Sequence, residues 1–92
     1  MKKEPENGAF RDSLGWAYFK LGNLDEAIAE LEKAAELIPY DSEIREHLGE
    51  AYLEKGGEFT AKAITQWEKA LEIKPNNSML QQRLEELSKS LE

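Results

Sequence analysis

Residues 14–39 read LGWAYFKLGNLDEAIAELEKAAELIP, and residues 48–75 repeat their pattern as LGEAYLEKGGEFTAKAITQWEKALEIKP. The Leu-Gly-x-x-Tyr motif that opens each stretch recurs after 34 residues, whereas the proline that closes each stretch recurs after 36. The second copy is therefore two residues longer, and the extra residues fall in its turn at residues 56–58. Self-similarity at a period of this length is the signature of a repeat architecture.

Both copies have the composition and the spacing of α-helices. Ala, Leu, Glu and Lys dominate them, and apolar residues recur every three or four positions, as on one face of a helix. One such stripe consists of Phe10, Leu14, Ala17 and Leu21, and another consists of Leu24, Ala27, Ile28, Leu31, Ala34, Ala35 and Ile38. Breaks at residues 22–23, 39–41, 56–57 and 75–77 predict five helices of roughly 14 to 17 residues each.

The residues at these breaks are typical of helix ends. Asn23, with Glu26 three residues later, has the pattern of an N-cap, and Asp41 can cap the following helix. Asn76 or Asn77 can do the same for the last helix. Because every break is only two or three residues long, consecutive helices are expected to lie antiparallel to one another.

The composition limits what the chain does. It has 92 residues, enough for one small domain, and 40% of them are hydrophobic and 34% charged. Its 19 acidic and 12 basic residues give a net charge of −7, which argues against nucleic acid or an anionic membrane as the partner. With no cysteine and one histidine, no metal site and no cofactor are expected. The chain has neither a membrane-spanning run nor a signal peptide, so a cytoplasmic location is expected.

The repeated pattern resembles the tetratricopeptide repeat (TPR), a helix–turn–helix unit with a period of 34 residues. The first unit carries the family's motif at Leu14, Gly15, Tyr18, Gly22, Ala27, Leu31, Ala34 and Pro39. The second unit carries it at Leu48, Gly49, Tyr52, Gly56, Ala63, Trp67, Ala70 and Pro75. The resemblance covers residues 8–75 and implies an all-α, right-handed superhelix of about five antiparallel helices, an α-solenoid.

The register divides the chain into four segments. These are a frayed N-terminal segment at residues 1–6, a TPR-like repeat at 7–41, a second repeat with the two-residue turn insertion at 42–75, and a capping helix at 76–92. In the cap, Glu85 and Ser88 stand where the family has Gly and Tyr, which suggests that no further helix packs there.

The spacing of small and large residues predicts how the helices pack. Gly15 and Gly49, and on the second helices Ala27, Ala34, Ala63 and Ala70, let a neighbouring helix come close. The large residues expected to fill the space between the helices are Leu14, Tyr18 and Leu31 in the first unit and Leu48, Tyr52 and Trp67 in the second. The sequence therefore predicts interdigitated packing of small residues against large ones.

Peptide-binding TPR domains hold their ligand in a concave groove, on the inner face of the first helix of each repeat. Carried over to this chain, the groove positions are Asp12, Trp16, Phe19, Glu43, Glu46, His47, Glu50, Leu53, Glu54, Met79 and Arg83. Further positions of the same set are Ser13, Lys20, Gln82 and Glu86. The resemblance thus implies a groove for a peptide or a helix.

The most distinctive part of this set is an acidic row at Glu43, Glu46, Glu50 and Glu54. Like charges four residues apart on a helix destabilise it by ~0.2–0.5 kcal/mol per pair. Acids kept on an inner face at this cost favour a basic ligand. The alternative is a solvated acidic face, partly compensated by Arg83, Lys20 or Arg45 nearby.

Two further features leave their roles open. Trp16, beside Phe19, either offers an aromatic anchor to a ligand or packs on the N-terminal segment or the neighbouring helix. His47 lies four residues after Glu43, a spacing that can bind a metal. A lone histidine among solvated carboxylates is the simpler interpretation, and we expect no metal here.

These observations predict a non-catalytic protein–protein interaction module. Its partner would be a peptide or helix, of basic or mixed basic and apolar character, bound in the concave groove. The alternative is a structural or self-associating unit, either a fragment of a longer repeat array or a homo-oligomer. No nucleophile paired with a base and no phosphate-binding loop is evident, so no enzymatic activity is expected.

Overall fold

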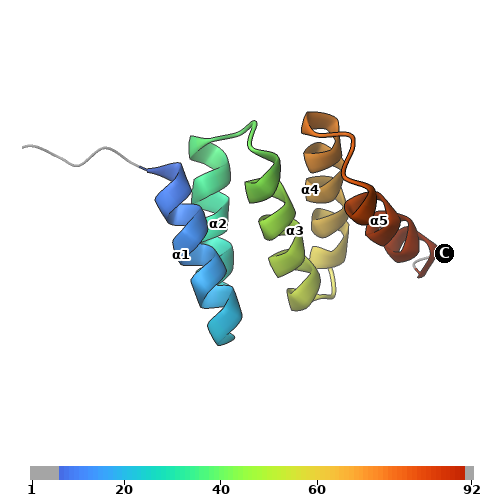
Figure 1. Ribbon diagram of the computed structural model, residues 1–92. Coiled ribbons are helices and arrows are strands. Elements are labelled where there is room, and N and C mark those ends of the chain that lie inside the picture. The colour runs from blue at the N-terminus through green and yellow to red at the C-terminus, as the bar shows by residue number, and fades with distance from the viewer. Residues whose placement is uncertain (1–6, 91–92) are drawn as a thin grey trace, which may run out of the picture.

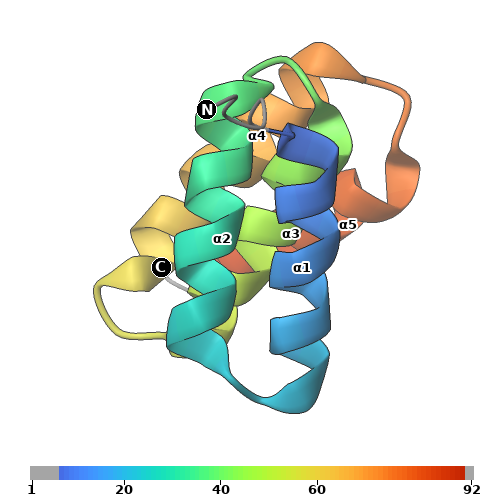
Figure 2. The same cartoon turned by 90° about the vertical axis from the view of Figure 1, so that its left-hand side faces the viewer.

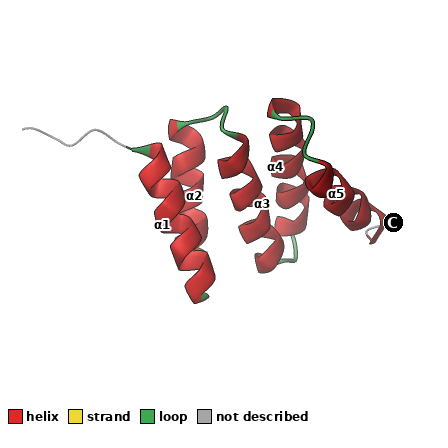
Figure 3. Ribbon diagram, in the orientation of Figure 1, coloured by secondary structure: helices red, strands yellow, loops and turns green. Residues whose placement is uncertain are grey.

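The computed structural model describes residues 7–90, and that part of the chain forms five α-helices and no strand (Figure 1, Figure 3). The helices are α1 (Gly8–Leu21), α2 (Leu24–Leu37), α3 (Ser42–Lys55), α4 (Phe59–Ile73) and α5 (Ser78–Ser90). Consecutive helices run antiparallel, so α1–α2 and α3–α4 are helix hairpins, and α5 follows at the C-terminal end (Figure 1). The predicted all-α repeat architecture is confirmed.

Capping hydrogen bonds form where the sequence predicts them for α3 and α5, but not for α2. Asp41 and Asn77 each accept a hydrogen bond, at 3.1 Å, from the backbone N–H three residues further along. Asn23 does occupy the predicted N-cap position of α2, but its side chain makes no capping hydrogen bond. Its φ of −86° and ψ of 76° lie outside the extended conformation that turns a capping side chain toward the helix.

Each hairpin is held together where a glycine faces a large side chain. A Cβ added at Gly15 would lie 2.7 Å from Leu31 Cγ, and one added at Gly49 would lie 2.4 Å from Trp67 Cδ1. Only glycine permits so close an approach. The residues that face the glycines and the neighbouring helix are almost completely buried; they are Leu31, Trp67, Ala27, Ala34, Ala63 and Ala70. The predicted packing of small against large residues is confirmed here and for the buried Leu48 and Tyr52, whereas Leu14 and Tyr18, also predicted to fill such space, are only partly buried.

The two inserted residues stay in the turn between α3 and α4. Gly56 and Gly57 have positive φ values, 75° and 57°, which glycine adopts without strain. α4 then begins at Phe59, which packs against the same hydrophobic core as Leu24 at the start of α2. The longer turn therefore leaves this core contact in place.

The ends of the described chain are less buried than its middle. The stripe predicted from Phe10 to Leu21 is not a core stripe, because both of these side chains are exposed. A periodic apolar pattern shows that a helix has an apolar face, but not that the face is covered. At the other end, α5 buries Leu80 against Trp67 and Ala70. The predicted N-terminal segment and Leu91 lie outside the described residues.

Candidate functional site

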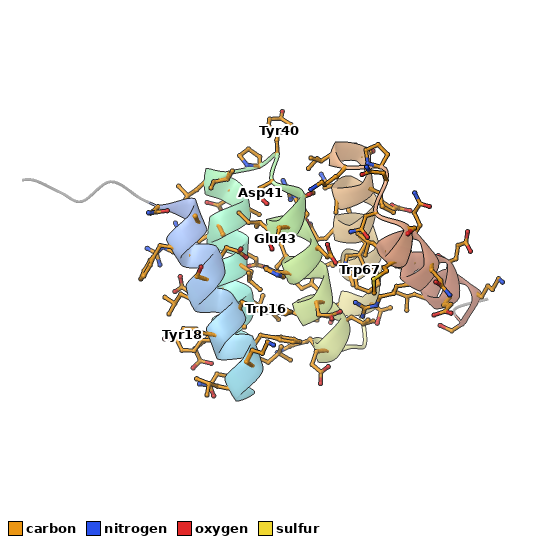
Figure 4. The ribbon with its side chains drawn as sticks, viewed as in Figure 1. Trp16, Tyr18, Tyr40, Asp41, Glu43 and Trp67 are labelled. Atoms are coloured by element: carbon orange, nitrogen blue, oxygen red, sulfur yellow. The ribbon has the colours of Figure 1, made fainter. Side chains whose placement is uncertain are left out.

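The predicted groove residues lie on the first helix of each repeat and on the cap, and we call this surface the α1–α3–α5 face. α1 carries Asp12, Trp16 and Phe19, α3 carries Glu43, Glu46, His47, Glu50, Leu53 and Glu54, and α5 carries Met79 and Arg83. In Figure 4, Trp16 extends from α1 toward α3, on the side of α1 opposite to Tyr18.

Trp16 is packed between two other rings. Its centroid lies 4.7 Å from that of Phe19 and 4.1 Å from that of His47, with interplanar angles of 7° and 17°. If the Phe19 and His47 rings were stacked on the same face of the indole at these distances, they would clash with each other. They therefore cover its opposite faces. Of the roles that the sequence left open for Trp16, packing on the neighbouring helix is the one the contacts favour.

A polar contact reinforces this packing. His47 Nδ1 lies 2.8 Å from Asp12 Oδ1, and the two side chains are only 18% and 13% exposed. The pair joins α1 to α3 across 35 residues of sequence. Asp12 and His47 thus hold the first repeat against the second. Within residues 7–90, no group of three or more His, Cys, Asp and Glu side chains is placed to hold a metal ion.

The acidic row of α3 divides into paired and unpaired members. Glu50 accepts two hydrogen bonds from the guanidinium of Arg83, at 2.6 and 3.2 Å. Glu46 accepts one from the side-chain amide of Asn77, at 3.3 Å. The carboxylates of Glu43 and Glu54 are exposed and make no hydrogen bond or ion pair with any other residue between 7 and 90. The compensation expected from Arg83 therefore reaches only one carboxylate.

Two residues that sequence reasoning did not place at this site connect it to the cap. Trp67 donates its indole N–H to the Glu46 carbonyl at 3.1 Å, and the Arg83 guanidinium lies 4.6 Å from the Trp67 ring centroid. Asn77 both caps α5 and contacts Glu46. The repeat register marked Trp67 only as a core residue, and the cap residue Asn77 only as a helix start.

A cavity of about 310 Å³ opens where α1 ends beside the last turn of α3. It is lined by Phe19, Gly22, Leu24 and Glu54. An aromatic ring and an aliphatic side chain thus share a hollow with an unpaired carboxylate. On α5, the apolar Met79 side chain is 75% exposed. Leu53, between these two places, is partly buried and packs against the core on both sides.

The group with the strongest electrostatic perturbation lies away from this face. The Tyr52 hydroxyl donates to Glu32 Oε2 at 2.5 Å, which joins α3 to α2. Burial, together with this hydrogen bond, raises the pKa of Tyr52 well above its ordinary value of 10.0. The phenol therefore stays neutral and holds two helices together.

Comparison with known proteins agrees with this geometry. A family model described as "TPR repeat" matches residues 15–56. The chain belongs to the tetratricopeptide repeat family. The resemblance predicted from the two repeated motifs is confirmed, and the TPR family is one of protein-interaction scaffolds rather than of catalysts. No helix of this TPR protein between residues 7 and 90 is both long and apolar enough to cross a membrane.

Three known proteins are similar to this chain in sequence or in fold. Superkiller complex protein 3 of Homo sapiens is 40% identical over 63 residues, which are 68% of this chain but only 4% of that protein. The solution structure of a TPR domain protein from Salinibacter ruber has a TM-score of 0.67 and 26% identity, and covers 96% of this chain and 86% of its own. The first TPR of Spaghetti (RPAP3), bound to the HSP90 peptide SRMEEVD, shares the fold (TM-score 0.52, 21% identity, 91% and 92% covered).

Proposed function

We propose that this TPR protein is a non-catalytic module that binds a peptide or helix of mixed basic and apolar character on its α1–α3–α5 face. The observation that carries the proposal is the cavity in which Phe19 and Leu24 stand beside the unpaired carboxylate of Glu54. A Lys or Arg side chain fits such a place, since its methylene stem can cover apolar surface while its charged end meets the acid.

The charges of the face support a basic partner. Glu43 and Glu54 lie near the two ends of α3, and the protein carries a net charge of −7. The peptide bound by the Spaghetti TPR, SRMEEVD, has three acidic residues and one arginine. Such a peptide would meet like charges here, and like charges facing each other across an interface are unfavourable. We therefore infer a ligand of the opposite charge.

The packing of Trp16 restricts which groups would meet the ligand. Because Phe19 and His47 cover both faces of the indole, Trp16 stiffens the face rather than offering a free ring. Apolar contacts would then come from Phe19 at one end of the face and from Met79 at the other. The partner would place its basic residue at the α1 end and an apolar residue toward α5.

Two labelled nine-residue peptides, one alternating Arg with Leu and one alternating Glu with Leu, test this proposal by fluorescence anisotropy. The Arg peptide is expected to bind and the Glu peptide to fail. Glu54→Lys should weaken the binding of the Arg peptide by about fivefold or more, because the attraction between Glu54 and an arginine is replaced by a repulsion. The matched control is Glu72→Lys on the exposed surface of α4, which makes the same change of charge away from the face.

The outcomes separate local recognition from general attraction. An equal loss of binding in Glu54→Lys and Glu72→Lys would mean that only the net charge of the protein attracts the peptide. Tighter binding of the Glu peptide would overturn the basic character of the ligand.

A further inference from the structure

Lys20, one of the predicted groove positions on α1, carries a positive charge without an acidic partner. Its side chain is exposed, and its ammonium nitrogen lies 5.7 Å from the centroid of the Trp16 ring. The ammonium group makes no hydrogen bond or ion pair with any other residue between 7 and 90. The arginine of the same face, Arg83, is already bonded to Glu50. Of these two cations, Lys20 is therefore the one available to a ligand.

Lys20 and Glu54 occupy the same position in the two repeats. Glu54 follows Lys20 by the 34 residues of the repeat, and each is the last residue but one of its helix. α1 and α3 run in the same direction, so both residues lie at the same end of the face (Figure 1, Figure 2). They form no ion pair with each other. Neighbouring repeats thus present a positive and a negative charge, both unpaired.

The packing around Trp16 fixes where the ammonium group lies. The indole is held between Phe19 and His47, and a lysine ammonium within about 6 Å of an indole centroid is attracted to the ring. Phe19, the residue before Lys20, also lines the cavity that contains Glu54. A ligand side chain in this cavity therefore has Lys20 as its neighbour on α1.

We propose that Lys20 selects the order of charged residues in the ligand, an inference that rests on the proposed function. The ligand carries an acidic residue that pairs with Lys20, a basic residue that meets Glu54 in the cavity, and an apolar residue toward Met79 on α5. The basic residue is the middle one of the three, whichever way the ligand runs. Packed helices lie ~8–10 Å apart and an extended chain rises ~3.3 Å per residue, so the acid and the base stand about three residues apart.

The order of the three residues can be tested without changing the composition of the ligand. One labelled peptide has Glu, Arg and Leu in that order, each three residues apart with Gly and Ser between them, and a second peptide exchanges Glu and Arg. Both are made in the forward and in the reversed direction, and binding is measured by fluorescence anisotropy. The better of the two peptides with a central Arg is expected to bind about threefold more tightly than either peptide with a central Glu.

Lys20→Met gives the sharper test, because it should change two affinities in opposite directions. It should weaken the peptide with a central Arg by about threefold, since the acidic residue of that peptide loses its partner. It should strengthen the peptide of alternating Arg and Leu by about twofold, since a repulsion between like charges is removed. A residue with a purely structural role would weaken the binding of both peptides.

Lys33→Met on the exposed surface of α2 is the matched control. It removes the same charge away from the face and should change neither affinity by more than about 1.5-fold, because exposed charges beyond a Debye length are screened. Lys20 and Lys33 are both exposed, so both variants should keep their helices, which circular dichroism checks.

Three results would overturn the proposal. Equal affinities for the two orders would show that Lys20 selects nothing, even where the peptide of alternating Arg and Leu binds as the proposed function requires. An order preference that persists in Lys20→Met would assign the selection to another residue. Failure of every peptide to bind, including that of alternating Arg and Leu, would overturn the proposed function and this inference with it.

Discussion

The α1–α2 and α3–α4 hairpins carry the same pattern of small and large residues, yet they have different surroundings. The second hairpin lies between α2 and α5, whereas the first has a described neighbour on one side only (Figure 1). The large residue opposite the glycine is Leu31 in the first hairpin and Trp67 in the second, and only Trp67 also packs against the cap. A shared repeat pattern thus fixes the fold of each hairpin, while its place in the stack decides how strongly each residue stabilises the protein.

The largest difference between the two hairpins is expected in the free energy of unfolding of Trp67→Ala and Leu31→Ala. Both leave a cavity opposite a glycine, and we expect Trp67→Ala to lower the free energy of unfolding by about 3–5 kcal/mol. Leu31→Ala should cost less, because it does not also release α5. Urea denaturation measures both values, and hydrogen exchange of the α5 amides should rise only in Trp67→Ala. An equal loss in the two variants would show that the cap adds nothing.

Overpacking compares the same position in the two hairpins. Ala34→Leu and Ala70→Leu place three more carbons in fully packed sites and should each cost about 1–3 kcal/mol. Ala29→Leu on the exposed side of α2 is the control and should leave the stability nearly unchanged. Unchanged thermal stability in both core variants would contradict the helix packing described above.

The two tyrosines of the repeated motif offer a smaller and sharper comparison. Tyr52→Phe leaves Glu32 without its hydrogen bond, and we expect a loss of about 1–2 kcal/mol in the free energy of unfolding. Tyr18→Phe should change it by less than ~0.5 kcal/mol, because no described residue bonds to that hydroxyl. Equal effects would mean that the hydroxyl of Tyr52 is unimportant for the packing of α2 on α3.

The raised pKa of Tyr52 adds a dependence on pH. In the folded state this phenol keeps its proton above its ordinary pKa of 10.0, whereas in the unfolded chain it loses it. Its contribution to stability is therefore complete below about pH 10 and is lost as the pH rises further. Between pH 9 and 11 (about one unit either side of that value), Tyr52→Phe should lose less stability than the wild type. A parallel decline in both proteins would contradict this role.

The smallest effect is expected at the polar contact between α3 and α5. Arg83 and Glu50 are 42% and 27% exposed, so Arg83→Ala should lower the free energy of unfolding by about 1 kcal/mol or less. Raising the salt concentration should shrink the difference between the variant and the wild type, because the pair is screened. A difference that persists in 1 M salt would mean that stacking on Trp67 matters more than the charge.

The sequence predicts the packing of each hairpin because that packing depends on residues at fixed spacing. The repeat alone identifies Gly15 and Gly49 as positions of close approach and Leu31 and Trp67 as large residues that fill the space between helices. The sequence also identifies Asp41 as a cap. These features are local or recur in register. The helix boundaries agree with the predicted breaks for the same reason, since glycine and proline end helices wherever they occur.

The side-chain contacts of the candidate site could not be predicted in the same way. The pairing of Asp12 with His47, across 35 residues, depends on how far the second repeat turns relative to the first. The same holds for Glu50 with Arg83. The register placed all four residues on one face, but only the arrangement of the helices shows that they contact each other. The exposure of Phe10 was missed because it depends on the lack of a covering helix.

Asn77 uses the two ends of one side-chain amide for two different jobs. Its oxygen accepts from the backbone N–H at the start of α5, and its nitrogen donates to the Glu46 carboxylate on α3. Aspartate is ordinarily as good a helix cap as asparagine. At this position an aspartate would place its carboxylate against the carboxylate of Glu46, and the two would repel each other. The contact between α5 and α3 therefore requires asparagine where helix capping alone would accept either residue.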